Sequence, residues 1–537
     1  MSKKLQELFQ ERGPIKTIGV IGMGYVGIPA AVLFADAPAF DRVYGFQRDS
    51  ESSGYKIAML NAGESPLKGE EPGLEELIAK VVGKGKKTDR SVKFICTSDF
   101  SMIAECDAVT LAIQTPFENP KDLIPDFTPL TEGIRNVGRY MTPGTLVVLE
   151  STITPGTTTG MAREILEEES GLVAGKDFGL AHAPERVMVG RLLKNIREHD
   201  RIVGGIDEVS TKRASELYGP VLTKGQLIPM SATAAEVTKT AENTFRDLQI
   251  AAANQLALYC EAMGINFYDV RTGVDSLKGE GITRAILWPG AGVGGHCLTK
   301  DTYHLERGIS VIAAEPLSYP EGRESLFVLA RGINDFMPSH MLKLTKDALA
   351  RAGKDIRGAK IALLGWAFLN NSDDARNTPS EVYRDLCLEE GAEVSVHDPY
   401  VLTYPGVLIA QDLNAVLRGA DVVAVLTGHS QYRALDPVRC RAVMGQAEGQ
   451  AEKQAEKQAE KQAEGQAEKQ AEKQAEGQAE KQAEIELQPH PVVVDGRDIV
   501  DPDAWIAEGF VYKGIGRGDK NRHPVSGLPH DKKNIVG

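Results

Sequence analysis

The sequence contains little that would point to a disulfide-linked, zinc-binding or membrane-spanning protein. Its six cysteines, at positions 96, 106, 260, 297, 387 and 440, are scattered and include no C-x-x-C pair. This spacing is typical of reduced thiols, not of a disulfide framework or a zinc site, so no metal is expected. No apolar run reaches the roughly 18 residues that a membrane-spanning helix needs. The first dozen residues include acidic side chains and no apolar segment, so we expect no secretory signal and a cytoplasmic protein.

The sequence also has no excess of basic over acidic residues. The net charge of −14 argues against nucleic acid or an anionic membrane as a main partner. The apolar content is sufficient to form sizeable hydrophobic cores, since 42% of the 537 residues are hydrophobic. A chain of this length is too long for one core and predicts about three domains of roughly 150 residues each.

The most distinctive stretch that is present reads W-P-G-A-G-V-G-G-H-C-L-T-K-D, at residues 288–301. Its four glycines let the backbone approach a ligand closely. Cys297 follows them and precedes Lys300, Asp301 and a helix-compatible run. A cysteine at a helix N-terminus beside a lysine is where the thiol pKa tends to fall, which favours a nucleophile. The alternative is a buried structural cysteine in a glycine-rich turn.

Residues 15–46 follow the order strand, glycine-rich turn, helix and strand. The turn carries Gly22, Gly24 and Gly27 in the pattern G-x-G-x-x-G. In this context the glycines allow a tight turn and the close approach of a pyrophosphate, which the N–H groups at the helix N-terminus can bind. The pattern therefore predicts a dinucleotide-binding domain.

The second strand of this unit departs from the usual pattern at its end. An acidic residue is expected there for the ribose 2′-hydroxyl, but Gln47 occupies the position and Arg48 follows. Glutamine can still hydrogen-bond a hydroxyl, whereas Arg48 or Lys56 could face a 2′-phosphate. NAD is the favoured cofactor, and NADP stays open.

Strand–helix alternation continues past this unit, with polar residues where strands end. Thr115 follows one apolar run, and Ser151 and Thr152 follow another. Ligands of an open parallel sheet bind beyond the carboxyl ends of its strands, so these residues are candidates for a binding site.

A long helical pattern without proline covers residues 232–263. Lys239 and Asn243 are four residues apart within it and share one face. A helix of this length between two domains favours a central spine or a dimer interface.

The predicted fold class is α/β, with two Rossmann-like doubly wound domains joined by a central long-helix region. The expected domains are 15–205, a central region 206–340 that includes the cysteine, and a second Rossmann-like domain formed by 355–446 and 485–515. An A-E-K-Q repeat at 447–484 has no apolar stripe. It is predicted to be an insertion that is disordered or a frayed helix.

Seven motifs occur in a fixed order along the chain. They are G-M-G-Y-V-G (22–27), E-S-T-I-T-P-G-T-T (150–158), A-P-E-R (183–186), A-E-V-T-K-T-A-E-N (235–243), G-V-G-G-H-C-L-T-K-D (292–301), G-W-A-F-L-N-N-S-D-D-A-R (365–376) and V-D-G-R (494–497). Together they resemble the nucleotide-sugar dehydrogenases of the UDP-glucose/GDP-mannose dehydrogenase family. The resemblance implies an NAD-binding domain, a central dimerisation region, a domain for the UDP-sugar substrate, and a homodimer or higher homo-oligomer.

The resemblance also implies roles for individual residues. Cys297 is the expected nucleophile, passing through a thiohemiacetal and a thioester. Lys239 and Asn243 are expected to handle the proton and stabilise the oxyanion of the first step, and Glu185, Asp301 and Thr152 to act on water. The expected cofactor-binding residues are Gly22, Gly24, Tyr25, Val26, Gly27, Gln47, Lys56, Thr115, Ser151 and Arg376. The expected substrate-binding residues are Arg186, Arg284, Gly294 and Arg497.

The sequences P-E-R and G-V-G-G-H-C are similar to the branch of the family that acts on N-acetylated hexosamines. This implies NAD-dependent, four-electron oxidation of C6 of UDP-N-acetyl-D-mannosamine to the uronic acid, for polysaccharide biosynthesis. UDP-glucose and UDP-N-acetylglucosamine are the alternatives. Leu369 stands where family members often carry a lysine, which weakens one expected substrate contact. A nucleotide-sugar-binding protein without turnover is the competing class, but a binder has no need of both Cys297 and Lys239.

Overall fold

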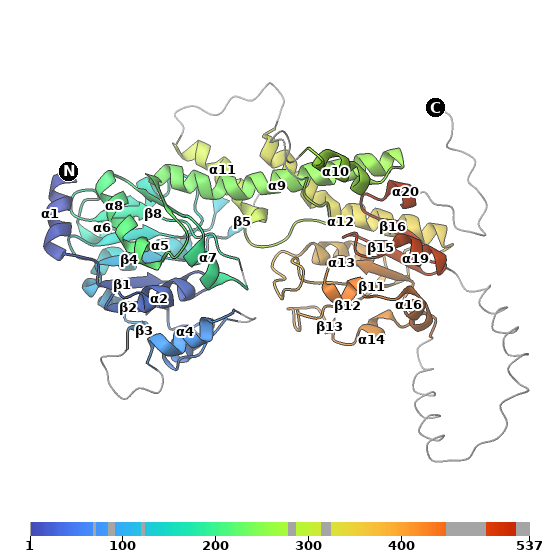
Figure 1. The fold of residues 1–537 in the computed structure, drawn as a ribbon, viewed down its shortest axis with the longest axis horizontal. Coiled ribbons are helices and arrows are strands. Elements are labelled where there is room, and N and C mark those ends of the chain that lie inside the picture. Colours follow the sequence, from blue (N-terminus) through green and yellow to red (C-terminus); the bar gives the residue numbers. More distant parts are fainter. Residues whose placement is uncertain are drawn as a thin grey trace, which may run out of the picture. The chain divides into compact units, whose positions relative to one another are not determined.

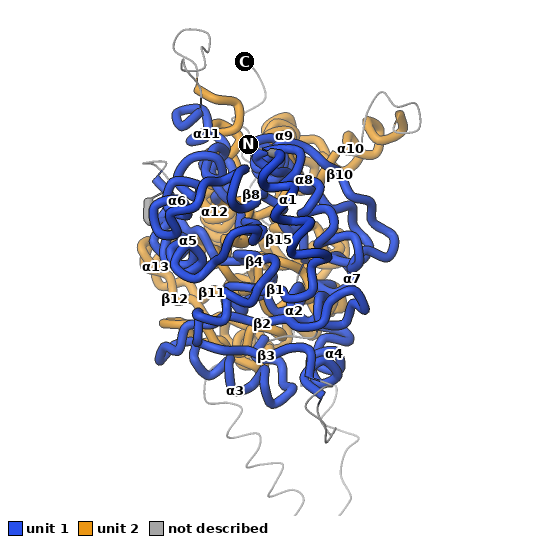
Figure 2. Tube along the Cα trace, turned by 90° about the vertical axis from the view of Figure 1, so that its left-hand side faces the viewer, with its two compact units in different colours: residues 1–244, 300–323 blue, residues 245–299, 324–537 orange. Residues whose placement is uncertain are grey.

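The computed structural model describes residues 2–67, 71–83, 92–119, 124–188, 190–277, 286–312, 324–446 and 490–521. Arg284 and the repeat at 447–484 lie outside the described residues. The chain forms two compact units, shown in Figure 2. Unit 1 comprises residues 1–244 and 300–323, and unit 2 comprises residues 245–299 and 324–537.

Unit 1 is an α/β unit (Figure 1). Its helices and strands are α1 (Ser2–Arg12), β1 (Thr17–Ile21), α2 (Gly27–Asp36), β2 (Arg42–Phe46), α3 (Tyr55–Asn61), α4 (Leu74–Val81), β3 (Phe94–Thr97), η2 (Phe100–Glu105), β4 (Ala108–Leu111), β5 (Phe117–Asn119), β6 (Ile124–Pro125), α5 (Thr128–Tyr140), β7 (Leu146–Leu149), η4 (Thr158–Ala162), α6 (Arg163–Ser170), β8 (Gly179–His182), α7 (Leu192–Glu198), β9 (Arg201–Gly205), α8 (Glu208–Tyr218), η5 (Gly219–Val221) and β10 (Leu227–Ser231). The helix α11 (Leu298–Ile312) begins two residues before the chain returns to this unit.

The sheet of unit 1 has the order β10-β9-β8-β7-β4-β1-β2-β3. Its strands are parallel except where β9 meets β8. The order β3-β2-β1-β4-β7-β8 is that of a dinucleotide-binding fold, in which the strand order reverses between β1 and β4. The glycine-rich turn after β1 therefore lies at the point where ligands bind.

Side-chain alternation explains why this sheet is buried on both faces. Leu146 and Val148 belong to one apolar cluster with α2 and α4, whereas Val147 and Leu149 belong to another with α5 and α6. Successive side chains of a strand point to opposite faces, so an uninterrupted apolar strand needs helices on both sides. The predicted doubly wound arrangement is confirmed.

The first sheet extends beyond residue 205. The expected boundary at 205 falls at the end of β9, but β10 pairs with β9 and extends the sheet. Unit 1 then continues to Thr244, and the region 206–340 contributes residues to both compact units. The strand β10 has the sequence L-I-P-M-S, and the proline within so short a run argues against a strand when the sequence is taken alone.

The helix α9 (Ala232–Met263) has the predicted bounds and carries the chain from unit 1 into unit 2. The other elements of unit 2 are α10 (Phe267–Asp275), α12 (Leu326–Arg351), β11 (Lys360–Leu364), α13 (Pro379–Glu389), β12 (Glu393–His397), β13 (Ile409–Ala410), α14 (Leu413–Leu417), β14 (Val422–Val425), α15 (Ser430–Arg433), α16 (Pro437–Met444), β15 (Val492–Asp495), α19 (Pro502–Ala507), β16 (Val511–Gly514) and α20 (Gly518–Asn521).

The sheet of unit 2 is parallel throughout, in the order β13-β12-β11-β14-β15-β16. This is again the order of a doubly wound nucleotide-binding fold. Leu363 packs in the cluster that includes α12 and α13, and its neighbour Leu364 packs in the cluster that includes α14, α16 and α19. Both faces are thus covered, and the second predicted Rossmann-like domain is confirmed.

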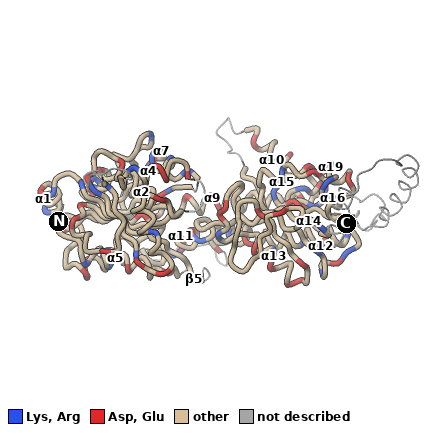
Figure 3. The backbone as a smooth tube through the Cα atoms, turned by 90° about the horizontal axis from the view of Figure 1, so that it is seen from below, with Lys and Arg blue, Asp and Glu red and all other residues tan. Residues whose placement is uncertain are grey.

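Basic and acidic residues are interspersed along the described backbone of both units (Figure 3). No helix among the described residues is long and apolar enough to cross a membrane. Within the same residues no three His, Cys, Asp or Glu side chains are grouped as metal ligands.

Candidate active site

The glycine-rich turn after β1 fits a dinucleotide. Gly22 has a φ of +98°, and a Cβ there would lie 2.5 Å from the carbonyl oxygen of Ala112. A Cβ on Gly27 would collide with the carbonyl oxygen of Gly22, whereas one on Gly24 would meet nothing within 4 Å. Gly22 and Gly27 are therefore needed by the turn itself. The open space over Gly24 suits the close approach of a pyrophosphate, with Tyr25 and Val26 leading into α2.

Gln47 and Lys56, which follow β2 in the sequence, both form hydrogen bonds with the backbone of this turn. Gln47 Oε1 accepts a hydrogen bond from the N–H of Met23 at 3.2 Å, and its Nε2 donates to Ser53 Oγ at 2.9 Å. Lys56 Nζ donates to the carbonyl oxygen of Met23 at 2.9 Å, and burial lowers the pKa of this lysine. Arg48 is exposed. The Lys56 ammonium is thus engaged by the turn, which favours a cofactor without a 2′-phosphate.

We expect kcat/KM for NAD to exceed that for NADP by about tenfold or more, a difference of about 1.4 kcal/mol. Steady-state kinetics with both cofactors measure this. Lys56→Met should lower both values together, because the side chain supports the turn, and Arg48→Met should leave their ratio unchanged. A preference for NADP that Arg48→Met abolishes would show that Arg48 recognises a 2′-phosphate.

The loops after β4 and β7 are joined to each other at the carboxyl edge of the sheet. Thr115 Oγ1 donates to the carbonyl oxygen of Thr152 at 2.5 Å. Ser151 Oγ accepts from the N–H of Ile113 at 2.9 Å and lies 3.3 Å from the carbonyl oxygen of Leu111. Since β4 is the neighbour of β1, the structure brings Thr115, Ser151 and Thr152 to the edge that carries the glycine-rich turn.

The residues predicted on α9 and α11 meet in the interior of unit 1. Asn243 Nδ2 donates to Asp301 Oδ2 at 2.6 Å, and Asp301 is fully buried. Lys239, one helical turn before Asn243, is only 8% exposed. Among the described residues no hydrogen bond or ion pair engages Lys239 Nζ. A buried ammonium and an oriented amide on one helix face are suited to stabilising negative charge on a substrate oxygen.

Lys300 was not predicted as a site residue, although it stands inside the cysteine motif. Its Nζ lies 3.5 Å from Asp301 Oδ1 and 3.4 Å from both Thr115 Oγ1 and His304 Nε2. His304 Nδ1 is in turn 3.0 Å from Thr154 Oγ1. Lys300 therefore connects the start of α11 to the strand-end loops. The motif contains Lys300, but its contact with Thr115 joins positions that are 185 residues apart in the sequence.

Glu236 was also missed, and it holds the E-S-T-I-T-P-G-T-T segment against α9. Its carboxylate is fully buried and accepts hydrogen bonds from the N–H groups of Gly156 at 2.6 Å and Thr158 at 2.8 Å. Burial raises the pKa of Glu236, and these hydrogen bonds oppose the shift. The A-E-V-T-K motif contains this glutamate, but nothing in the motif distinguishes a buried one from an exposed one.

Glu185 and Arg186 are both engaged within unit 1. Glu185 forms an ion pair with Arg201, and each side chain is 6% exposed. The backbone N–H of Arg186 donates to Glu185 Oε1 at 2.7 Å. The Arg186 guanidinium donates to the carbonyl oxygen of Asp200. Nearby His182 is fully buried, and burial, with smaller effects of the Arg201 and Lys239 charges, lowers its pKa to about 3. The imidazole is therefore neutral.

In unit 2, Cys297 is exposed, whereas the other five cysteines are buried. It directly precedes α11, so the predicted position at a helix N-terminus is confirmed. The glycines before it pack on the segment after β11. The N–H of Gly295 donates to the carbonyl oxygen of Arg376 at 2.8 Å, and a Cβ on Gly294 would lie 2.5 Å from Phe368 Cβ. Gly294 thus lets the cysteine segment lie against Phe368.

Arg376 and Arg497 lie at loops that follow strands of this sheet. The guanidinium of Arg376 bonds to both carboxylate oxygens of Asp374, at 2.8 Å and 2.5 Å. Arg497 Nε donates to the carbonyl oxygen of Leu426 at 2.7 Å. Leu369, in the place of the expected lysine, is 48% exposed. Arg497 stands at the carboxyl edge of the sheet, where a nucleotide is expected to bind.

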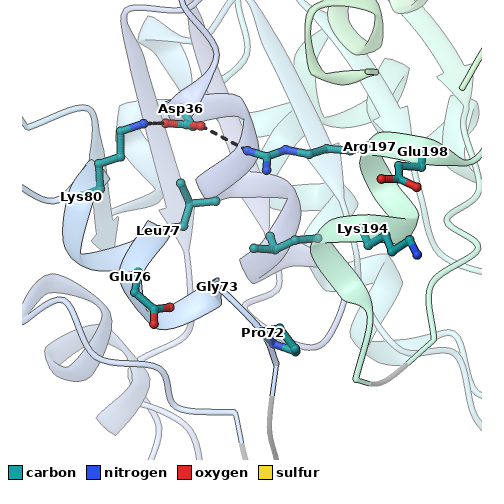
Figure 4. Close-up of a pocket in the computed structure, with 10 residues that line it drawn as sticks. Asp36, Pro72, Gly73, Glu76, Leu77, Lys80, Lys194, Arg197 and Glu198 are labelled. Atoms are coloured by element: carbon teal, nitrogen blue, oxygen red, sulfur yellow. Dashed lines mark hydrogen bonds and ion pairs between the residues drawn. The ribbon is translucent and has the colours of Figure 1, made fainter. Parts of the chain in front are cut away.

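A separate surface hollow on unit 1 lies between α4 and α7 (Figure 4). Asp36 pairs there with Lys80 and, at 3.2 Å, with Arg197. None of the predicted site residues lines this hollow. The hollow is therefore distinct from the residues predicted to bind the cofactor or to carry the chemistry.

Comparison with known proteins identifies the domains of the chain. Residues 16–222 match the NAD binding domain of the UDP-glucose/GDP-mannose dehydrogenase family, 233–316 its central domain, and 362–450 its UDP binding domain. The UDP-N-acetyl-D-mannosamine dehydrogenase of Pyrococcus horikoshii is 34% identical over 505 residues, 94% of this chain and 99% of that protein. The enzyme of the same name from Escherichia coli K12 is 31% identical and is covered over 95% of its length, against 78% of this chain.

Solved structures give the same result. The NDP-N-acetyl-D-galactosaminuronic acid dehydrogenase of Methanosarcina mazei Go1 is 67% identical, with a TM-score of 0.82 over 97% of this chain and 99% of that one. The UDP-D-ManNAc dehydrogenase structure from Pyrococcus horikoshii is 31% identical, with a TM-score of 0.73 over 94% of this chain and 100% of that one. The chain therefore belongs to the UDP-glucose/GDP-mannose dehydrogenase family and is a nucleotide-sugar dehydrogenase that uses NAD.

Proposed function

We propose that the protein oxidises C6 of a UDP-N-acetylhexosamine to a carboxylate in two steps, through a thioester on Cys297. The observation that carries this proposal is the position of Cys297. It is the exposed cysteine among six, and it stands at the N-terminus of the helix that also bears Lys300 and Asp301. The partial positive charge of a helix N-terminus favours the thiolate, which is the nucleophilic form.

The first oxidation removes a proton and a hydride from the C6 alcohol and leaves an aldehyde. NAD, when bound, supplies the acceptor for the hydride of each oxidation. Lys239 and Asn243 are the proposed partners of the C6 oxygen. One N–H of the Asn243 amide is fixed on Asp301, and its second N–H has no protein acceptor among the described residues. That N–H and the Lys239 ammonium can both donate to an alkoxide as its charge develops.

The second oxidation requires a nucleophile, because an aldehyde has no hydride to release until something adds to its carbonyl. The sulfur of Cys297 bonds to C6, and the carbonyl oxygen takes a proton to give a thiohemiacetal. Loss of a hydride from C6 and of the hydroxyl proton gives a thioester. Water then attacks this carbonyl, the C–S bond breaks, and the thiolate is regenerated with the uronate.

Asp301 is the proposed base for this hydrolysis, with Glu185 and Thr152 placing the water. Asp301 Oδ2 is bonded to Asn243, but Oδ1 accepts no hydrogen bond within the described part of the chain. The Lys300 ammonium lies 3.5 Å from Oδ1 as an ion-pair partner, and Oδ1 can still accept a proton from water because no hydrogen bond occupies it. The Glu185 carboxylate is engaged by Arg201, which favours an orienting role for it.

UDP-N-acetyl-D-mannosamine is the first candidate substrate, supported by the relatives whose names state that activity. A second candidate is UDP-N-acetyl-D-galactosamine. The relative that is 67% identical is named for N-acetyl-D-galactosaminuronic acid. Both candidates share the acetamido group and the C6 hydroxyl, and they differ in configuration at C2 and C4.

NADH formation with UDP-N-acetylmannosamine, UDP-N-acetylgalactosamine, UDP-N-acetylglucosamine and UDP-glucose tests the substrate. We expect kcat/KM for one N-acetylhexosamine to exceed that for UDP-glucose by about 100-fold, the effect of an unmet polar contact of about 2.7 kcal/mol. A protein that binds UDP-sugars but reduces no NAD with any of them would contradict the proposed catalysis. Preference for UDP-glucose would overturn the hexosamine assignment alone.

We further propose that the protein is a homodimer that uses α12 and the part of α9 that lies in unit 2. Tyr259 and Met263 of α9, and Leu326 and Leu329 of α12, are each more than half exposed. Exposed apolar side chains in such number favour an interface between copies.

Tyr259→Arg should shift the protein from dimer to monomer on a sizing column with light scattering. Leu408→Arg, at a side chain that is 89% exposed elsewhere in unit 2, is the control. A monomeric parent protein would contradict the dimer.

A further inference from the structure

We propose that Asn254 is a positioning residue for Cys297: it fixes the glycine-rich segment ahead of the thiol through the backbone of Gly290, backed by a buried chain of polar side chains. The inference rests on the proposed function, since it assumes that Cys297 is the nucleophile. All the residues of this hydrogen-bonded network belong to unit 2.

The chain of hydrogen bonds runs from α12 to the cysteine segment. Arg331 forms an ion pair with Asp247 Oδ1, and Asn334 Nδ2 donates to the same oxygen at 2.8 Å. Asn254 Nδ2 donates to Asn334 Oδ1 at 2.8 Å. Asn254 Oδ1 accepts the backbone N–H of Gly290 at 2.9 Å. Each amide thus has its donor and acceptor assigned by its neighbours, so none can flip without losing bonds.

Burial distinguishes these contacts from exposed polar contacts between two helices. Asn254 and Asn334 are fully buried, and Arg331 is 1% exposed. Around them α9 and α12 pack through small and apolar residues such as Ala257 and Met337. Well-packed apolar side chains would stabilise such an interface at least as well as a buried ion pair. A polar chain that ends on the backbone of a loop fixes the position of that loop.

The cysteine segment has a second anchor at its other end. The N–H of Gly295 is held by the carbonyl oxygen of Arg376, and Asn377 Nδ2 donates to the carbonyl oxygen of Gly295 at 3.2 Å. Gly290 and Gly295 therefore bracket the segment, and Cys297 follows two residues later. Loss of the Gly290 anchor frees one end of the segment. A shift of about 1 Å in a reacting group is enough to cost about 100-fold in rate.

The test compares the Asn254→Leu variant with the parent protein, each assayed with the UDP-sugar substrate. The substitution removes the hydrogen bonds to Asn334 and to Gly290 and keeps a side chain of similar shape. We expect kcat for uronate to fall by about 10- to 100-fold with KM for the UDP-sugar within about threefold. The aldehyde should escape before the thiol captures it, so NADH formed per uronate should rise above two, and semicarbazide should trap the aldehyde. Thr345→Val is the matched control. It deletes a buried hydroxyl bonded to Tyr383 in the same unit, with no connection to Gly290.

Asn254→Asp is the conservative variant and gives a pH signature. A protonated carboxyl can donate to Asn334 and accept from Gly290, as the amide does, whereas an ionised one faces Asn334 Oδ1 without a proton. Burial raises the pKa of an introduced carboxyl and Asp247 adds to the shift, whereas Arg331 and the Arg497 guanidinium, which lies against Gly290, oppose it. The activity of the variant relative to the parent should therefore rise as pH falls, a response that general destabilisation does not produce.

The outcomes separate the two proposals. If Cys297→Ser abolishes uronate but Asn254→Leu keeps the parent kcat and the ratio of two NADH per uronate, the positioning role is overturned. An activity ratio of Asn254→Asp to parent that does not change with pH overturns it as well, even if Asn254→Leu fails to fold. If Cys297→Ser still makes uronate, the failure lies with the covalent mechanism.

Discussion

Replacing Cys297 with serine should lower the rate of uronate formation by about 10⁴-fold or more, while NAD and the UDP-sugar still bind with near-parent affinity. A serine hydroxyl is far less nucleophilic than a thiolate at neutral pH, so the aldehyde has no route to the second oxidation. The first oxidation does not use the thiol. Quantification of NADH and uronate after a single turnover should show at most one NADH per active site and no uronate.

The matched control is Cys440→Ala, because that thiol is buried on α16 and has no assigned role. It should alter stability but not the ratio of NADH to uronate. Steady-state uronate formation by Cys297→Ser at the parent rate would exclude the thioester. A variant that makes aldehyde but no acid would agree with it.

Lys239→Met should lower kcat by about 10² to 10³-fold, the effect of removing one oxyanion donor. The ammonium is buried on α9, and the residues that the structure describes give it no carboxylate partner, so its charge is available to the C6 oxygen. Methionine keeps the length and apolar stem of the side chain. The loss should therefore appear in kcat with little change in the melting temperature or in KM for NAD.

Lys194→Met is the control for this variant, since Lys194 is exposed on α7. It should leave kcat unchanged. If Lys239→Met raises KM for the UDP-sugar and leaves kcat at the parent value, the lysine binds the ground state of the substrate and does not stabilise the oxyanion. That result would move the proton-handling role to Asn243 or to another group.

The parts of the molecule that could be predicted from the sequence are those with a fixed local spacing. The turn at Gly22–Gly27, the bounds of α9 and the position of Cys297 ahead of α11 all follow from patterns within a few turns of chain. The reason is physical: glycine at positive φ, helical periodicity and helix termini are properties of short segments.

Other features depend on contacts between distant segments and could not be predicted. Glu236 bonds to backbone about 80 positions away, at Gly156 and Thr158. Asn254 resembles any polar residue of a long helix until Asn334 and Gly290 are placed against it. The strand β10, which reads L-I-P-M-S, could not be recognised for a local reason, because a proline within a short apolar run argues against a strand.

The most direct test of the covalent mechanism is acid quenching during turnover, followed by mass spectrometry of the peptides. An Asp301→Asn variant is the protein of choice, because loss of the proposed base should slow hydrolysis and let the thioester accumulate. We expect the mass of a UDP-uronyl group on the peptide that contains Cys297, present only when NAD and the UDP-sugar are both added. Absence of any adduct while uronate is being formed, or an adduct on another cysteine, would contradict the assignment of Cys297 as the nucleophile.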